Sequence, residues 1–190
     1  MLRQLPPPYQ QRIKKAFNSI SLLFIFFSTG GFEFVLTQNQ EAPFSIELIV
    51  PISTPNGHRE ISIERYYNLH VLIKNVSPHP QRLWKDWNTW GFFNLRLEWM
   101  AAGKTFPISR KAPKVWNGDF PDYWVLEPGE TVVLFIDMRS GDWEGFPDLY
   151  GERIPAKIKA IYENKRDVLA DEFAIWYGKI ETPEIEVIFK

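Results

Sequence analysis

Few residues in this chain have the type and spacing needed for covalent or metal chemistry. None of the 190 residues is a cysteine, which excludes a disulfide framework, a thiolate nucleophile and a cysteine-ligated metal. The three histidines, His58, His70 and His79, show neither the H-E-x-x-H spacing nor another close pair, so they do not predict a zinc site. We interpret them as solvated surface residues.

Carboxylates gather in one later stretch of the chain. The members of this group are Asp137, Asp142, Glu144, Asp148 and Glu152. Its D-x-E pair could offer oxygen ligands to calcium, but the spacing fits no EF-hand loop, and a solvated acidic loop is the favoured interpretation. Asp119 and Asp122 could contribute to a glycosidase-type carboxylate pair, although acidic pairs are common in loops.

Other catalytic signatures are missing from the sequence. The chain has no G-x-S-x-G elbow, no glycine-rich phosphate loop and no G-x-G-x-x-G motif. We therefore expect no catalytic residue, no metal site and no cofactor, and we do not expect an enzyme.

Aromatic residues give the stronger signal. They make up 16% of the chain, which has 8 tryptophans. Trp99 has the spacing of a core residue, but most of the others fall in three connections between the strands predicted below. The candidate ligand-binding residues are the aromatic residues of these connections: Trp84, Trp87, Trp90, Trp116, Tyr123, Trp124 and Trp176.

Alternation of apolar and polar residues with a period of two predicts the strands that must position these side chains. In 92–101, for example, Phe93, Leu95, Leu97 and Trp99 share one face. The predicted strands span residues 44–52, 67–76, 92–101, 104–109, 131–138, 153–162 and 183–189, and a turn of helix is expected near 167–172. Seven strands that each have one apolar face must bury those faces against one another, which predicts an all-β sandwich.

Four stretches of sequence are informative about the kind of sandwich. Residues 69–77 (LHVLIKNVS) end in an Asn-x-Ser bend, and residues 126–130 (LEPGE) form an L-x-P-G-E turn. Together with 156–162 (AKIKAIY) and the later W-x-G of 176–178, they resemble bacterial secreted immunoglobulin-like domains. The position where a tyrosine would start the next-to-last strand is Ala156, so the resemblance does not imply a tyrosine corner. It implies an immunoglobulin-like β-sandwich of about seven antiparallel strands with long loops, in a class of domains that bind, inhibit or space other proteins.

The resemblance also implies where the aromatic connections emerge. In an immunoglobulin-like sandwich the connections after the second, fourth and sixth strands lie at one end, so six tryptophans are expected there and Trp143 at the other end. Two interpretations stay open. In one, the long loops pack their rings into a cap on the sandwich; in the other, some rings stay exposed and contact a partner.

The amino terminus has a different composition from the rest. Residues 1–30 carry four cations, and no acid occurs before Glu33. The apolar run 20–27 follows, and it is too short for a spanning helix, which needs about 20 residues. This pattern is typical of a cleavable signal peptide, and the alternative is a buried strand or helix of the domain itself. We expect an exported, periplasmic or extracellular domain over 31–190 that begins between about Ser28 and Phe34, with no membrane span after signal removal.

Charge narrows the class of partner. The chain has 22 basic and 23 acidic residues, a net charge of −1, which excludes a nucleic-acid binder that relies on a basic excess. The expected function is a non-enzymatic extracytoplasmic binding or interaction module that engages an unknown protein partner through its aromatic-rich loop end. The alternative is a carbohydrate-binding domain that takes a glycan, and a glycan-active hydrolase is the third hypothesis. A planar row of exposed rings would favour sugar, whereas an irregular apolar patch would favour a protein.

Overall fold

The computed structural model describes residues 42–51, 57, 59–61, 68–116, 120–137, 141–146 and 153–189. These residues belong to one compact unit, Gln40–Lys190. Several features predicted from the sequence lie outside the described residues: the signal segment 1–30, His58, Asp119, Met138, Asp148 and Glu152.

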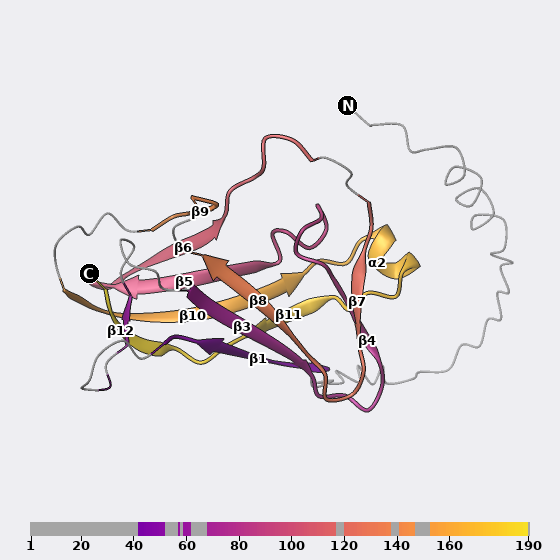
Figure 1. Ribbon diagram of the computed structural model, residues 1–190, viewed down its shortest axis with the longest axis horizontal. Helices are drawn as coiled ribbons and strands as arrows, with labels where there is room; N and C mark the ends of the chain where they lie inside the picture. Colours follow the sequence, from indigo (N-terminus) through magenta and orange to yellow (C-terminus); the bar gives the residue numbers. More distant parts are fainter. Residues whose placement is uncertain are drawn as a thin grey trace, which may run out of the picture. The chain divides into compact units, whose positions relative to one another are not determined.

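The larger of two main sheets forms the back layer of the molecule in Figure 1. Its strands, in spatial order, are β2 (Glu60–Ile61), β12 (Ile185–Phe189), β10 (Ile154–Asn164), β5 (Leu95–Ala101), β6 (Lys104–Arg110) and β9 (Trp143–Glu144). A further strand, β11 (Gly178–Glu181), pairs with the carboxyl-terminal part of β10. Neighbouring strands are antiparallel except for β2 and β12, which run parallel.

The smaller sheet lies across the larger one and consists of β1 (Phe44–Ile49), β3 (Asn68–Asn75) and β8 (Thr131–Asp137), all antiparallel (Figure 1). The inner faces of the two sheets share one hydrophobic core. Val71 and Ile136 enter it from the smaller sheet, and Leu97, Trp99 and Ile158 enter it from the larger sheet; all five side chains are fully buried. The all-β fold class predicted from the sequence is therefore confirmed.

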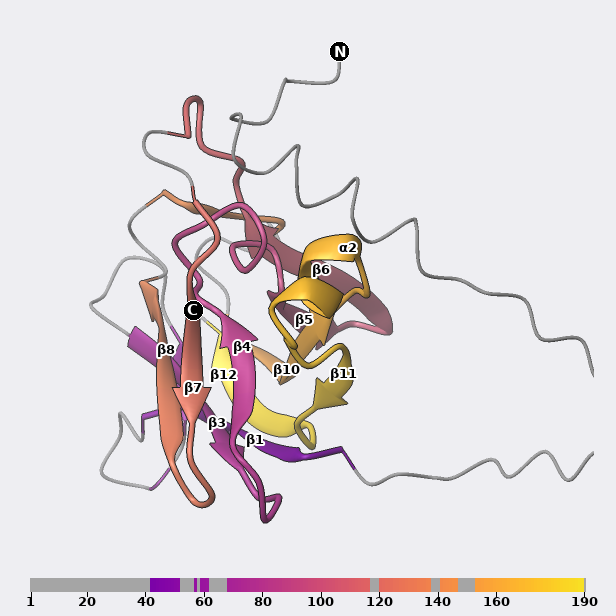
Figure 2. The same ribbon diagram turned by 90° about the vertical axis from the view of Figure 1, so that its right-hand side faces the viewer.

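A two-stranded ribbon, β4 (Gln81–Trp84) and β7 (Tyr123–Leu126), continues from the ends of β3 and β8 (Figure 2). Asn75 makes the corner: its Nδ2 donates to the carbonyl oxygens of His79 and Leu126, both at 2.8 Å, and its Oδ1 accepts from the backbone N–H of Ser77 at 2.9 Å. The buried Asn75 amide thus bonds backbone groups both before and after the bend, and these bonds fix the bend that the Asn-x-Ser pattern predicts.

A short helix, α2 (Val168–Glu172), follows β10, where a helical turn was expected. Asp167 caps it, because its Oδ1 accepts from the N–H of Ala170 at 2.6 Å. Among the described residues no helix is both long and apolar enough to cross a membrane.

Each of the seven predicted strands is present, with ends within three residues of those predicted. The alternation did not predict β2, β4, β7, β9 or β11. The inward orientation expected for Phe93 is wrong: Phe93 precedes β5 in a turn, and half of its side chain is exposed. The period-two pattern begins only at Leu95, where pairing with β10 begins.

Candidate functional site

The β4–β7 ribbon has apolar side chains on both faces, and each face covers a different cluster. Leu83 pairs with Trp124, and this pair packs on the main core. Trp84 pairs with Tyr123, and this pair lies on the opposite face because side chains alternate along a strand. The segment that contains α2 covers that second face with Ala170, Phe173 and Ile175.

Trp84 is the centre of this second cluster, which we call the aromatic cap: Trp84, Trp90, Tyr123 and Phe173. The centroid of its ring lies 5.9 Å from that of Trp90, 6.3 Å from that of Tyr123 and 5.8 Å from that of Phe173. Only 1% of Trp84 is exposed. Buried aromatic pairs in tilted and edge-to-face geometry stabilise a fold beyond their buried area. Trp84 therefore packs into a cap on the sandwich, which is the first of the two interpretations of the aromatic loops, and the partly buried Trp90 and Tyr123 pack with it.

Trp176 belongs to a different layer of contacts. Its ring stacks on the buried Tyr162 with centroids 6.4 Å apart, and it meets the edge of Phe44 at 5.3 Å. Burial raises the pKa of the Tyr162 phenol, whose oxygen accepts from Asn94 Nδ2 at 3.4 Å. The indole also lies against Gly178, which has a φ of +149°, and a Cβ at that position would overlap the ring. This glycine is therefore what allows the ring to lie where it does.

Trp176 also lines an open groove of about 830 Å³. Polar groups that could donate hydrogen bonds line the groove together with apolar side chains. The main lining residues are Pro43, Val76, His79, Gln81, Trp176, Tyr177 and Lys179. Aromatic and polar side chains occur together in small-ligand sites, although here the Gln81 amide contacts Ser77 and the Lys179 amine contacts Glu181.

Trp87 lies three residues after Trp84 and differs from it in exposure. Its side chain is 45% exposed and meets the ring edge of Phe120, which is 56% exposed, at a centroid distance of 5.2 Å and an interplanar angle of 71°. Exposed aromatic rings leave apolar surface in contact with water, which is unfavourable in the free molecule. A cluster of such rings is therefore typical of a binding surface.

Polar contacts hold the loop that presents Trp87. Asn88 is fully buried; its Nδ2 donates to the carbonyl of Asp122 at 2.8 Å, and its Oδ1 accepts from the N–H groups of Trp90 and Gly91. Lys85 and Asp122 form an ion pair at 2.8 Å. A Cβ at Gly91 would overlap the backbone of Lys85, so the loop closes only with glycine there. Trp87 is thus exposed on a structured loop.

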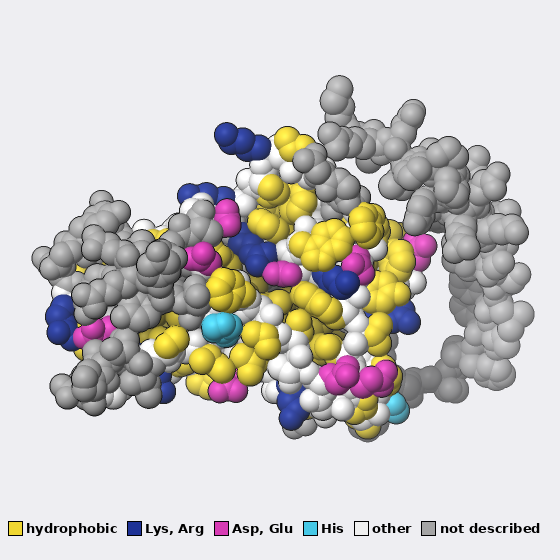
Figure 3. Space-filling view, viewed as in Figure 1, with side chains coloured by type: hydrophobic (Ala, Val, Ile, Leu, Met, Phe, Trp, Pro, Cys, Tyr) yellow, Lys and Arg dark blue, Asp and Glu magenta, His cyan; other side chains and the backbone are white. Residues whose placement is uncertain are grey.

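Arg110 joins this loop to a second aromatic group. Its guanidinium donates to the carbonyl and the carboxylate of Asp86 at 2.6 and 2.7 Å, and it lies 4.9 Å from the ring centroid of Phe92. Phe92 in turn meets Phe93 and Trp116 edge-on, at 81° and 87°. We call Trp87, Phe92, Phe93, Trp116 and Phe120 the Trp87 surface. Figure 3 shows hydrophobic side chains gathered on the face of the molecule that Figure 1 presents, interspersed with charged groups.

The structure corrects the expected position of Trp143. It was expected at the end of the molecule away from the other tryptophans, but the same Arg110 guanidinium lies 5.5 Å from its ring. The reason is that residues 143–144 form β9, which pairs with β6 at Ser109 and Arg110 and so brings the indole to the Phe92 side. Trp143 is 5% exposed and packs in the main core.

The seven predicted site residues therefore separate into three groups. Trp84, Trp90 and Tyr123 form the cap, Trp124 and Trp176 pack against the main core, and Trp87 and Trp116 belong to the Trp87 surface. Sequence reasoning missed Phe93 and Phe120 as candidates. Phe120 could have been included, since it lies in the same connection as Trp116, but no pattern in the sequence marks Arg110 or Asn88 as supports of the surface.

The polar candidates that the structure describes do not form a metal centre, and Asp119, named with Asp122 as a possible glycosidase carboxylate, lies outside the described residues. Asp122 is engaged by Lys85, and its Oδ1 accepts from the N–H of Tyr123. His70 meets the edge of Phe135 at 5.4 Å. In the described part of the chain no group of three or more His, Asp or Glu side chains is placed to hold a metal ion.

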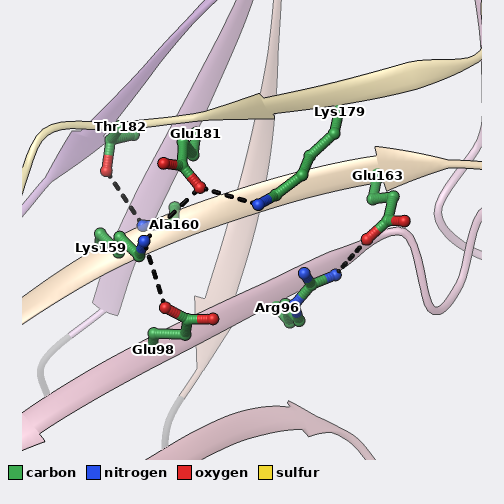
Figure 4. Close-up of polar contacts among 8 residues, drawn as sticks. All are labelled: Arg96, Glu98, Lys159, Ala160, Glu163, Lys179, Glu181 and Thr182. Carbon is green, nitrogen blue, oxygen red and sulfur yellow. Dashed lines mark hydrogen bonds and ion pairs between the residues drawn. The ribbon is translucent and has the colours of Figure 1, made fainter. Parts of the chain in front are cut away.

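The outer face of the larger sheet instead carries paired charges (Figure 4). Arg96 and Glu163 lie 2.8 Å apart, and Lys159 contacts both Glu98 and Glu181. The hydrogen bond from Arg96 lowers the pKa of Glu163, and the hydrogen bond from Lys179 lowers that of Glu181. These groups satisfy one another, which leaves this face without a free cluster of one charge sign.

Comparisons with known proteins give little further information. No protein-family model and no curated protein matches the chain. Among solved structures the chain is similar to a mutant β-glucosidase from Listeria innocua in complex with laminaribiose, with a TM-score of 0.35 and 12% sequence identity. The similarity covers 77% of this chain and 16% of that chain. A similarity at this level carries no argument about fold or activity.

Proposed function

We propose that this chain is a non-enzymatic interaction module that binds a protein partner through the Trp87 surface. The observation that carries the proposal is the geometry of these five rings, of which Trp87, Phe93 and Phe120 are exposed and Phe92 and Trp116 are partly buried. Neighbouring rings meet at 71°, 81° and 87°, so they form an irregular apolar relief and not a flat row. Sugar rings stack on flat aromatic faces, whereas interlocking aromatic edges and an adjacent arginine are typical of protein hot spots.

The supports of the surface strengthen this proposal. Arg110 and Asn88 fix the loop before a partner arrives, so little conformational entropy is lost on binding. Exposed aromatic side chains on a prearranged loop need few additional contacts to give a specific complex.

The fold that we propose for the module is an immunoglobulin-like sandwich. Support comes from the strand order, β1-β3-β8 in one sheet and β12-β10-β5-β6 in the other. In the order of the seven predicted strands this is one-two-five against seven-six-three-four, which corresponds to the A-B-E and G-F-C-C′ arrangement of such domains. The Asn75 corner and the ribbon of β4 and β7 are additions to that plan.

The proposal places the module outside the cytoplasm, on the strength of the acid-free amino terminus and its apolar run. Mass-spectrometric sequencing of the protein from its native host tests this part. A mature start between about Ser28 and Phe34 supports export, and an intact Met1 in a cytoplasmic fraction contradicts it.

Site-specific photocrosslinking tests the partner and its site together. A photoreactive amino acid at position 87 or 120 should yield a discrete protein adduct in native envelope material. The same probe at Val168, which is 78% exposed on α2, is the matched control and should yield none. The adduct at position 87 should disappear when Phe120 is changed to Ala, while the melting temperature stays unchanged. Equal adducts at 87 and 168 would contradict a specific surface.

A carbohydrate-binding function is the second candidate, and the groove beside Trp176 is the observation that favours it. Tyr177 is 45% exposed, and it lines the groove together with His79 and Lys179. Binding of the wild-type protein on a glycan array, lost in Tyr177→Ala and retained in Trp87→Ala, would support this function. The opposite pattern, with a crosslinked protein at Trp87 and an empty array, supports the first proposal.

A further inference from the structure

Strand β8 is an edge strand with an unusual composition. In the described residues it pairs with β3 along its whole length and has no strand on its other side (Figure 2). Its sequence, Thr131–Asp137 (TVVLFID), contains no lysine, arginine or proline, and its register with β3 runs without a bulge. Soluble proteins usually protect an open sheet edge with a lysine, a proline or a bulge, and β8 has none of the three. The side chains of Val133 and Phe135 are 55% and 47% exposed on the outer face.

The sequence of β8 matches itself when it is reversed. If two copies of β8 pair antiparallel with Leu134 opposite Leu134, then Val133 of each copy faces Phe135 of the other. Val132 then faces Ile136, and Thr131 faces Asp137. Every apolar residue meets an apolar one, and the single charge meets a hydroxyl. Cross-strand pairs of an aromatic with a β-branched residue are among the favourable ones in sheets.

The edges of the larger sheet do not offer a long strand that is complementary to itself. β2 and β9 are two residues long, which is too short for a stable ladder. β9 leaves most of β6 uncovered, but that stretch contains Lys104 and Pro107, which discourage edge pairing. The other edge of the smaller sheet is β1, where the outward-facing residues are Ser45, Glu47 and Ile49. An antiparallel pair of β1 strands centred on Glu47 would place two carboxylates opposite each other, which is destabilising.

We propose that two copies of this chain associate through antiparallel pairing of their β8 strands, about a two-fold axis at Leu134, into one continuous six-stranded sheet. The occupant of the edge is a second copy because the pattern of β8 is complementary to itself, which a two-fold interface requires. Pairing of one seven-residue strand buries less than the roughly 800 Å² per partner of a standard stable interface. The dimer should therefore form reversibly as concentration rises.

Sedimentation velocity of the full chain over a concentration series tests the proposal. The wild type should shift from one to two monomer masses. The double variant Val133→Lys/Phe135→Lys places lysine opposite lysine at both outer pairs and should stay monomeric. The double variant Val133→Lys/Phe135→Glu places lysine opposite glutamate at the same two pairs and should recover dimers. Both positions are about half exposed, so the melting temperatures of the two double variants should be alike.

Two controls separate the edge from other surfaces. Ile49→Lys changes the same outer face at the opposite edge, and it should leave the association constant within about twofold of wild type. Trp87→Ala should do the same, so that a failure here is distinct from a failure of the proposed binding function. A wild type that is monomeric at all concentrations overturns the proposal, as does loss of dimers in Ile49→Lys or no recovery in the lysine–glutamate variant.

Discussion

The two main sheets bury similar inner faces but carry different outer faces. On the larger sheet Lys159 lies between Glu98 and Glu181, and Arg96 lies against Glu163. On the smaller sheet the outward positions include Ser45, Glu47 and Lys74, but apolar side chains lie together on two of the cross-strand rows. These are Ile49, Leu72, Val133 and Phe135, with His70 against Phe135.

The difference bears on where the proposed partner contacts would form. Outward side chains contribute little to the core, so folding alone places only a weak constraint on which residues occupy these positions. Paired charges keep a face hydrated and discourage contact, whereas exposed apolar groups gain free energy only when something covers them. We infer that the larger sheet faces solvent, and that contacts form at the smaller sheet and at the Trp87 surface.

The sharpest test of this distinction uses two tryptophans on one short segment. Trp84→Ala should lower the free energy of unfolding by about 3–5 kcal/mol, because it leaves a cavity at the centre of the aromatic cap. Trp87→Ala should lower it by less than about 1 kcal/mol, because the ring is half exposed and touches mainly Phe120. Denaturant titration of both variants measures the difference. Equal losses would mean that Trp87 is a structural residue.

A second test uses two faces of one strand. Ile136→Ala should lower the free energy of unfolding by about 2–5 kcal/mol, and Leu97→Ala on the opposing sheet by a similar amount, since both are fully buried. Val133→Ala on the outer face of β8 should cost about 0.5 kcal/mol or less. Chemical denaturation of the three variants at low protein concentration gives the comparison. A large loss at Val133 would mean that the outer face is covered within the monomer.

The alternation of the long strands was enough to predict them and their buried faces. In β5 and β10 every second residue is apolar, and Leu97, Trp99 and Ile158 are buried as the pattern predicts. The strands that were missed lack that pattern for a physical reason. β4 and β7 lie between two clusters, so both of their faces are apolar, and β2 and β9 are only two residues long.

The candidate site was less predictable than the fold. Sequence spacing places Trp84 and Trp87 in one connection, but it does not show that α2 and its flanking residues cover Trp84 and leave Trp87 exposed. That outcome depends on contacts between segments about 90 residues apart, such as the hydrogen bond from Arg82 to the carbonyl of Phe173. Trp143 was misplaced for the same reason, because a two-residue pairing with β6 decides its position.

A smaller effect is expected on the charged face of the larger sheet. Lys159→Ala removes one amine from between Glu98 and Glu181 and should cost about 0.5 kcal/mol or less, since the pairs are partly hydrated and screened by salt. The loss should shrink further in high salt. Thermal denaturation at low and high ionic strength measures both. A cost comparable with that of Ile136→Ala would mean that the two faces of β10 are assigned in the wrong register.

The smallest effect concerns the acid limb of stability. Hydrogen bonds from Arg96 and Lys179 lower the pKa values of Glu163 and Glu181 below the ordinary carboxyl value of 4.5. A carboxyl group whose pKa is lower in the folded state binds fewer protons than it does in the unfolded chain. Its contribution to the free energy of unfolding is therefore complete above about pH 4.5 and is lost as the pH falls through the lowered folded value.

Denaturant midpoints measured from pH 6 down to about pH 3 should fall less steeply in the Glu163→Gln variant than in the wild type. Glu172→Gln, at an exposed position on α2, is the matched control and should keep the wild-type slope. Identical slopes in all three proteins would show that the ion pairs of the larger sheet keep its outer face hydrated without adding to its stability.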